Sequence, residues 1–305
     1  MKIGVDIGGT SVKLGVVDDD FSIVEMTKIP TGEKCTPDGV TEKIIEQCLI
    51  YKEKYDISSV GVGCAGRIDR ERGMVIVSGH LPFRNYKLVE PIQNALNLPT
   101  YIDNDASCAM IGEYAAGSCK GASDAIIVTI GTGIGGAILI DKKIYRGHNN
   151  RAGELGRMVI DMGGDECECS LHGCFEQYAS ASALLKLTEN YANNYPESIL
   201  AQLVEKEGSR GFVAFDAAKD GCEVAKALLD EYAQKLCVGL NSIIHIFQPE
   251  VLVLSGGIAK EGDTLLELIE PYVLKDCPIR ITAFDGNGGL LGAALLGTEY
   301  DNKKR

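Results

Sequence analysis

Hydrophobic and polar positions follow the same plan at two places in the chain. Near the start, the apolar run "KIGVDIGG" (2–9) ends in glycines and is followed by a second apolar run, "VKLGVVD" (12–18). Two apolar segments of strand length joined by glycines predict a β-hairpin. Residues 125–141, "AIIVTIGTGIGGAILID", repeat this arrangement and also end in Asp. The repetition predicts two structurally related halves.

The rest of the pattern alternates between helical and extended segments. Helices are expected over 40–54, 106–114, 183–195, 223–247, 264–272 and the small-residue segment "GLLGAALLG" (289–297). Strands are expected at 60–63, 100–105 and 250–257, whereas "RIDRERG" (67–73) has the composition of a charged turn. Alternating strands and helices indicate an α/β protein. The segment "GSCKGAS" (117–123) interrupts the pattern and predicts the boundary between the halves.

The composition argues against several classes of partner. The chain has 305 residues and a formal net charge of −13, and nucleic acids or anionic membranes call for clustered Lys and Arg instead. Asp6 stands where a signal peptide would have its apolar core, and no segment reaches the roughly 18 apolar residues of a membrane helix. We therefore expect a cytosolic protein without a nucleic-acid or membrane partner.

The eleven cysteines divide into two groups. In a reducing cytosol they would not form a disulfide framework. Eight are isolated and are expected to pack as small hydrophobic residues: Cys35, Cys48, Cys64, Cys108, Cys119, Cys222, Cys237 and Cys277. The other three, Cys167, Cys169 and Cys174 in "ECECSLHGC", have the spacing C-x-C-x₄-C, which favours metal ligands.

Two glycine segments, 61–66 and 131–136, match the dinucleotide pattern G-x-G-x-x-G literally. That pattern holds a pyrophosphate only where a helix follows, and here a charged turn and a strand follow instead. We therefore do not expect a Rossmann site. The sequence also has no G-x-x-x-x-G-K-[ST] phosphate loop.

Glycine loops inside hairpins can nevertheless bind phosphate through backbone N–H groups. Thr10 and Thr132 add hydroxyl donors, and Lys13 adds a cation. Either loop alone would also fit a simple tight turn. A third glycine loop, "SGG" (255–257), favours a nucleotide held between the two halves.

Six motifs occur in the order typical of the ROK family, named for repressors, open reading frames and kinases: "DIGGTSVK", "DNDAS", "TIGTGIGGAI", "AGELGR", "CECSLHGCFE" and "SGGIA". The chain resembles this family over nearly its whole length. The resemblance implies a two-lobed α/β fold of the actin-like ATPase (ribonuclease H-like) type with duplicated glycine-loop hairpins. It implies an N-terminal lobe (1–117) joined by a C-terminal helix (288–305), and a C-terminal lobe (118–287).

By the same resemblance, the chain would be a sugar kinase that uses ATP and Mg²⁺. The expected reaction converts glucose to glucose 6-phosphate, with N-acetylmannosamine, fructose and allose as alternative sugars. A non-catalytic sugar sensor or regulator of the same family is the alternative function. A regulator would carry a DNA-binding helix-turn-helix ahead of the first phosphate loop, which begins here at residue 6. Because family members are often dimers, the resemblance also implies a homodimer.

The resemblance assigns individual roles to residues. Asp105 would be the catalytic base, a task that suits a carboxylate because the base only accepts the sugar's proton. Asp103 is a rival base, although neighbouring side chains of an extended segment point to opposite sides. The sugar would contact Gly66, Arg67, Asn104, Asp105, Glu154 and Glu176. ATP and Mg²⁺ would contact Asp6, Gly8, Gly9, Thr10, Lys13, Gly131, Thr132 and Gly133, with the nucleoside against Gly256 and Gly257.

The resemblance also implies a structural zinc ion on Cys167, Cys169 and Cys174. The family's fourth zinc ligand is a His that also touches the sugar, and this chain has Arg157 at that position. Arginine stays protonated and cannot ligate a metal. Three alternatives stay open: a zinc ion with a substitute fourth ligand such as His172, His148, an acidic side chain or water; no metal; or a weakly bound metal. Arg157 would itself contact the sugar and favour a substituted or acidic one.

Overall fold

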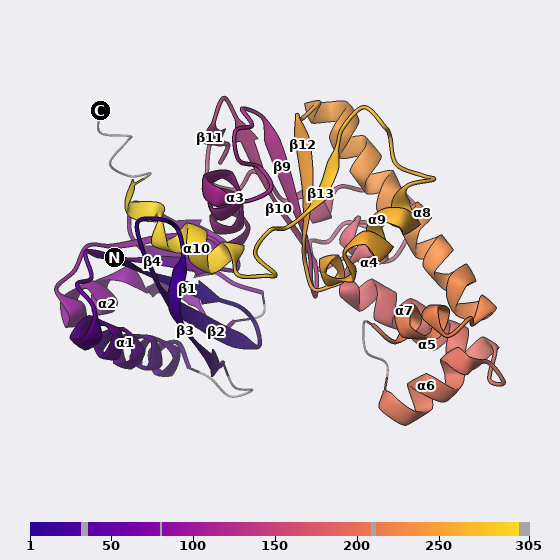
Figure 1. The fold of residues 1–305 in the computed structure, drawn as a ribbon, viewed down its shortest axis with the longest axis horizontal. Coiled ribbons are helices and arrows are strands. Elements are labelled where there is room, and N and C mark those ends of the chain that lie inside the picture. Colours follow the sequence, from indigo (N-terminus) through magenta and orange to yellow (C-terminus); the bar gives the residue numbers. More distant parts are fainter. Residues whose placement is uncertain (32–35, 80, 209–211, 299–305) are drawn as a thin grey trace. The chain divides into compact units, whose positions relative to one another are not determined.

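The computed structural model describes residues 1–31, 36–79, 81–208 and 212–298. The chain divides into two compact units. The first comprises residues 1–123, 137–152 and the segment from Thr282 onward, and the second comprises residues 124–136 and 153–281. Both contain strands and helices (Figure 1), which confirms the α/β class predicted from the sequence. No helix in the described ranges is long and apolar enough to cross a bilayer.

A five-stranded sheet forms the frame of the first unit. Its order is β3-β2-β1-β4-β8, and its strands are β1 (Lys2–Ile7), β2 (Ser11–Val17), β3 (Ile23–Pro30), β4 (Ser59–Cys64) and β8 (Thr100–Asn104). β1 and β2 form the predicted hairpin, and β4 is parallel to both β1 and β8. A smaller sheet in the same unit contains β5 (Arg67–Asp69), β6 (Met74–Val77) and β7 (Arg84–Lys87).

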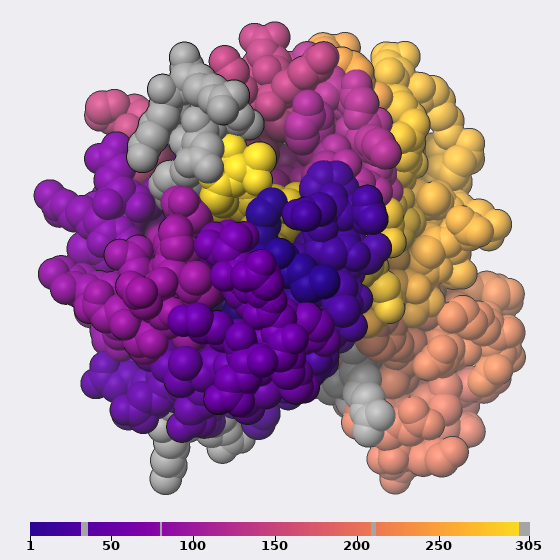
Figure 2. Space-filling model, turned by 60° about the vertical axis from the view of Figure 1, so that its left-hand side comes forward, coloured from indigo at the N-terminus to yellow at the C-terminus, as the bar shows by residue number. Residues whose placement is uncertain are grey.

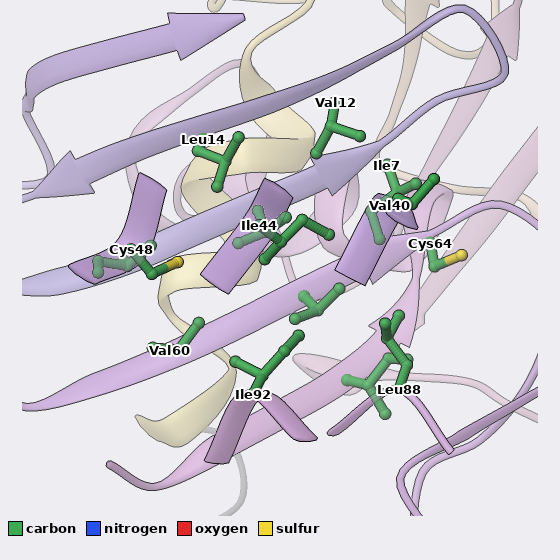
Figure 3. Packing of buried hydrophobic residues seen from close by; sticks show 14 of the residues in the cluster. Ile7, Val12, Leu14, Val40, Ile44, Cys48, Val60, Cys64, Leu88 and Ile92 are labelled. Atoms are coloured by element: carbon green, nitrogen blue, oxygen red, sulfur yellow. The ribbon is translucent and has the colours of Figure 1, made fainter. Parts of the chain in front are cut away.

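Side-chain alternation separates the two faces of the five-stranded sheet. On one face, the odd-numbered residues of β1 join α1 (Pro37–Lys54) and α2 (Val89–Leu96) in the main hydrophobic core. The core residues of α1 recur every three or four positions, at Val40, Ile44, Cys48 and Tyr51. They therefore lie on one side of that helix, and Figure 3 shows Val40, Ile44 and Cys48 against the strands.

The opposite face of this sheet is covered by α3 (Asp105–Ala116) and α10 (Gly288–Ala294). Glycines allow very close packing there. A Cβ atom at Gly61 of β4 would lie 1.7 Å from Ala293 O, and one at Gly292 of α10 would lie 1.7 Å from Cys108 O. The small-residue segment predicted as a helix therefore packs directly on the N-terminal strands. In Figure 2, yellow atoms of this C-terminal part show among the indigo and purple atoms of the N-terminal part.

The other five-stranded sheet has the order β11-β10-β9-β12-β13. Its strands are β9 (Ala125–Ile130), β10 (Ile134–Ile140), β11 (Lys143–Ile144), β12 (Val251–Gly256) and β13 (Ile279–Ile281). β9 and β10 are neighbours, as the second predicted hairpin requires, and β12 is parallel to β9 and β13. The helices of the second unit are α4 (Glu176–Ala179), α5 (Ala181–Asn194), α6 (Ile199–Glu207), α7 (Val213–Lys219), α8 (Glu223–Phe247) and α9 (Asp263–Ile269).

The sequence pattern predicts long elements more accurately than short ones. α8 has the predicted bounds. One prediction was wrong, because residues 67–73 begin with strand β5, which pairs with β6 and buries Ile68, and are not a charged turn throughout. Most isolated cysteines are buried, as expected, while Cys35 and the end of the predicted C-terminal helix (299–305) lie outside the described residues.

Candidate active site

Candidate residues of the first unit lie at the carboxyl edge of its parallel strands. In the sheet register, Asp6 of β1 is opposite Gly63 of β4, and Gly63 is opposite Asp103 of β8. One residue further along, Cys64 is opposite Asn104. Ligands of open α/β sheets bind at this edge, where the loops that follow the strands supply functional groups.

Asn104 fixes the position of Asp105, the predicted catalytic base. Asn104 Oδ1 caps α3 by accepting hydrogen bonds from Ala106 N at 3.0 Å and Ser107 N at 3.2 Å. Its Nδ2 donates to Asp105 Oδ1 at 2.9 Å and to Gly66 O at 3.2 Å. All four hydrogen-bonding positions of this amide therefore have protein partners. A sugar hydroxyl would bind Asn104 only in exchange for one of them.

The Asp6 side chain is half-buried at the end of β1. Burial raises the pKa of Asp6 from 3.8 to about 6, the nearby Asp105 adds to the increase, and Lys13 opposes it. Gly289 of α10 leaves room for this side chain, because a Cβ atom there would lie 3.2 Å from the Asp6 carboxyl carbon. Carboxylate oxygens in such a site are the donors that Mg²⁺ prefers. The residues present therefore fit the expected role of Asp6 in holding Mg²⁺.

The carboxylate of Asp103, the rival base, forms ion pairs with two arginines. Its side chain is 4% exposed, and Arg146 donates to Oδ2 from Nη2 at 2.7 Å and from Nε at 3.1 Å. Arg70 Nε forms an ion pair with the same oxygen at 3.2 Å. We call Arg70, Asp103 and Arg146 the Asp103 cluster. Asp103 differs from Asp105 because its carboxylate is buried in these ion pairs. Strand alternation does not explain the difference, since Asp105 already begins α3.

The first glycine loop is a tight turn between β1 and β2. Gly8 N donates to Ser11 O at 3.0 Å, while Gly9 and Thr10 are exposed at its tip. Lys13 lies opposite Asp6 in the hairpin, and its Nζ donates to Gly286 O at 2.5 Å. The structure therefore brings the predicted phosphate loop and its cation to the Asp6 edge of the sheet.

Gly66 occupies a position that only glycine fits. Its φ is +117°, and a Cβ atom there would lie 2.4 Å from Val77 O. Its carbonyl accepts a hydrogen bond from Asn104, which also bonds to Asp105, the predicted base. Arg67, the next residue, is exposed at the start of β5.

In the second unit, the glycine loops lie at the ends of adjacent parallel strands. Gly256 ends β12 opposite Ile130 of β9, and residues 131–133 follow β9 directly. Gly256 has a φ of +95°, and a Cβ atom there would lie 2.5 Å from Ile130 O, so this position also requires glycine. Thr132 is exposed. The predicted phosphate and nucleoside residues of this unit are therefore neighbours: Gly131, Thr132, Gly133, Gly256 and Gly257.

Glu176 lies beside the second glycine loop. A Cβ atom at Gly133 would lie 2.8 Å from Glu176 Oε2. Arg157 pairs with Glu176 Oε1, and Cys167 Sγ lies 3.4 Å from the same oxygen. We call Arg157, Cys167 and Glu176 the Arg157 cluster. Glu154 is at its border, with a side chain that is 61% exposed and 4.0 Å from Arg157 Nε.

The three predicted zinc ligands lie together. The sulfur atoms of Cys167, Cys169 and Cys174 are all within 4.8 Å of one another, and those of Cys169 and Cys174 are 3.4 Å apart. Within the described ranges, no His, Asp or Glu side chain joins this group of ligand atoms. Arg157 Nη1 instead donates to Cys167 Sγ at 2.9 Å.

The two histidines proposed as the fourth ligand do not join the three sulfur atoms. His172 is exposed, with Nδ1 3.2 Å from Gly164 O, and His148 is exposed as well. A structural zinc ion normally has four protein ligands. The described residues supply three, with a guanidinium beside them, so they do not complete a structural zinc site. We attribute no step of the chemistry to zinc.

Sequence reasoning missed the partners of Asp103. Arg70 lies in the segment interpreted as a charged turn, and Arg146 belongs to none of the six motifs. Their signal is indirect, because a carboxylate buried at a strand end needs cationic partners. Sequence reasoning also missed Gly289. Its importance shows only in the structure, where it lies beside the Asp6 carboxylate.

Comparisons with known proteins identify the family. The ROK family model matches residues 2–299. The chain is 35% identical to a glucokinase of Streptomyces coelicolor over 99% of this chain and 98% of that protein, and 30% identical to a glucokinase of Halalkalibacterium halodurans over 98% and 96%. The crystal structure of a ROK family glucokinase from Streptomyces griseus, in complex with glucose and AMPPNP, matches with a TM-score of 0.86 at 33% identity, covering 97% of this chain and 98% of that one. This likeness confirms the predicted fold class. The chain belongs to the ROK family.

Proposed function

We propose that the protein is an ATP-dependent sugar kinase that phosphorylates a hexose hydroxyl, with glucose as the first candidate. The observation that carries this proposal is the Asn104–Asp105 pair at the carboxyl edge of the sheet, next to Asp6. Phosphoryl transfer to an alcohol needs a positioned proton acceptor and a metal-binding carboxylate, and the half-buried Asp105 and Asp6 suit these two roles. The similarity to glucokinases over the whole chain supports the same conclusion.

Asp105 is the proposed base. The sugar hydroxyl oxygen would attack the γ-phosphorus of ATP, the bond from that phosphorus to the bridging oxygen would break, and ADP would leave. The hydroxyl proton would pass to Asp105. Asn104 Nδ2 bonds to Oδ1 of Asp105, which orients the carboxylate for this transfer.

Asp6 is the proposed Mg²⁺-holding residue, and bound Mg²⁺ neutralises charge on the phosphates during transfer. The two glycine loops would supply backbone N–H groups to the phosphates, as in other anion sites built from bare backbone. Lys13 adds an ammonium group on the Asp6 side. Gly256 and Gly257 would lie against the nucleoside.

Glu154 and Glu176 are the proposed sugar-binding carboxylates of the second unit. Glu176 Oε1 already accepts from Arg157 and Cys167, which leaves Oε2 for a hydroxyl. Glu154 has the more accessible carboxylate. In the first unit, Gly66 and Arg67 are proposed to contact the sugar, and the Gly66 carbonyl already connects this loop to Asn104.

Other features stay predictions. Arg157 contacts Glu176 and Cys167, so we propose that it acts on the sugar through Glu176. Zinc in the cysteine loop still requires a fourth ligand. The homodimer, the cytosolic location and the lack of nucleic-acid or membrane partners rest on the resemblance and the composition alone.

The test is a coupled ADP-release assay with glucose, N-acetylmannosamine, fructose and allose. We expect release with at least one sugar, and we expect Asp105→Asn to lower kcat by about 10²–10⁴-fold because the proton acceptor is lost. Absence of ADP release with every sugar, for a protein that is folded by circular dichroism, would instead support the sensor function.

A further inference from the structure

Three buried charges meet at the end of β8. The side chains of Asp103, Arg70 and Arg146 are 4%, 6% and 10% exposed, respectively. Buried charges are costly unless oppositely charged partners and hydrogen bonds compensate them. The ion pairs with Arg70 and Arg146 therefore help to hold the Asp103 carboxylate in place.

The members of the Asp103 cluster come from three separate segments of the first unit. Arg70 follows β5, Asp103 belongs to β8, and Arg146 follows β11. Arg146 is held in addition by a hydrogen bond from Nη1 to Ile144 O at 3.3 Å. The Asp103 carboxylate thus connects the end of β8 to two other parts of the unit.

The other oxygen of the Asp103 carboxylate, Oδ1, bonds to the segment that carries Asp105. Asp103 Oδ1 accepts a hydrogen bond from Asn104 N at 2.8 Å, and Asn104 Nδ2 donates to Asp105 Oδ1 at 2.9 Å. A continuous path of contacts therefore runs from the two arginines through Asp103 and Asn104 to Asp105.

We propose that Asp103 is a positioning residue, which the Arg70 and Arg146 guanidinium groups hold in place so that it fixes Asn104 and thereby orients Asp105 for proton transfer. Asp103 itself stays out of contact with the reacting atoms. This inference rests on the proposed kinase function, in which Asp105 is the base.

The variant Asp103→Asn tests the proposal because it keeps the side-chain shape and removes the charge that holds both arginines. We expect kcat to fall by at least about tenfold, since small displacements of a catalytic group are enough to slow transfer strongly. We expect KM for ATP to stay within about twofold, because the phosphate loops are unchanged.

Glu113→Gln is the matched control. Glu113 is a fully buried carboxylate of α3 that accepts hydrogen bonds from Ser118 N at 2.7 Å and Ala283 N at 3.1 Å. Its loss also removes a buried charge from the first unit, but away from Asn104. At a temperature at which circular dichroism shows both variants folded, we expect this control to keep kcat within about twofold of the wild type.

Hydrogen exchange supplies a readout that does not need activity. In the nucleotide-free full-length protein, Asp103→Asn should speed amide exchange at Ala106 and Ser107, which donate to Asn104 Oδ1, and Glu113→Gln should leave exchange there unchanged. Wild-type protein that phosphorylates no sugar would overturn the proposed function, and the exchange result would still decide whether Asp103 holds the segment. Unchanged exchange in Asp103→Asn, or a kcat equal to that of the wild type, would overturn the positioning role.

Discussion

Two arginine–carboxylate clusters, one in each unit, differ in burial and in charge balance. The Asp103 cluster has two guanidinium groups on one carboxylate, with side chains between 4% and 10% exposed. In the Arg157 cluster one guanidinium meets one carboxylate, and the side chains of Arg157 and Glu176 are 35% and 15% exposed. The same pair of chemical groups is thus placed in two different dielectric surroundings.

The difference in burial determines how much each cluster contributes to the stability of the protein. In the Asp103 cluster, the side chains are nearly inaccessible to water, so removing one partner of an ion pair is costly. In the Arg157 cluster, water can solvate the guanidinium if its partner is removed, and the net energy of the pair is small. We therefore expect the first cluster to limit stability and the second to adjust local geometry and ligand preference.

The largest difference should come from removing the carboxylate of each cluster. Asp103→Asn removes a buried carboxylate that pairs with two buried guanidinium groups and should lower the free energy of unfolding by about 3–5 kcal/mol. Glu176→Gln leaves the partly exposed Arg157 and should cost about 1 kcal/mol. Urea denaturation of both variants at neutral pH measures the comparison. Equal losses would show that burial does not separate the clusters.

Asp6 is a half-buried carboxylate whose pKa is raised by its surroundings. Its pKa is raised from 3.8 to about 6, so the folded protein binds the proton more tightly than the unfolded chain does. Stability from this group is therefore present at low pH and is lost as pH rises through about 6. At about 1.36 kcal/mol per pKa unit, the loss at pH 7.5 is about 3 kcal/mol.

Asp6→Asn should remove this loss of stability at pH values above about 6. Without Mg²⁺, the variant should be more stable than the wild type by up to about 3 kcal/mol at pH 7.5 and nearly equal to it at pH 4. Urea denaturation across this pH range is the measurement. A wild type that is more stable than the variant at pH 7.5 would mean that Lys13 compensates the carboxylate fully.

Arg157→His should complete a metal site beside the Arg157 cluster, because the sulfur atoms of Cys167, Cys169 and Cys174 already lie together there. With four ligand side chains available, the variant should bind about one zinc ion per chain, and zinc at 100 times its Kd would stabilise it by about 2.7 kcal/mol. Elemental analysis and thermal unfolding with and without chelator measure this. The control is the double variant Arg157→His/Cys169→Ala, which should lose the zinc. A wild type that already binds one zinc ion per chain would contradict the argument.

The two clusters also mark where sequence reasoning succeeds and fails. Glycine loops and strand ends were accessible from motifs, because local spacing fixes them, whereas the candidate base Asp105 came from the resemblance to the ROK family. The sequence also shows Asp103, Asn104 and Asp105 as neighbours. Arg146, however, lies 43 positions away from Asp103 in the sequence, and no local spacing predicts the contact between them. The same holds for the Arg157–Glu176 pair: both residues were candidates, but the guanidinium was expected at the sugar or beside a metal, and it pairs with the carboxylate.

The smallest effect on stability is expected from Arg157→Met. Because the guanidinium is 35% exposed, its removal should change the free energy of unfolding by about 1 kcal/mol or less, similar to Lys54→Met at the exposed Lys54–Glu25 pair. Its effect should appear in specificity instead. Without Arg157, Glu176 Oε1 keeps only the contact with Cys167 and can also accept a sugar hydroxyl, so the ratios of kcat/KM among the four sugars should change, whereas Lys54→Met should leave them as they are. Steady-state kinetics over the sugar panel measures these ratios. Unchanged ratios for Arg157→Met would mean that the Arg157 cluster does not shape sugar binding. The two clusters would then differ only in how much each contributes to the free energy of unfolding.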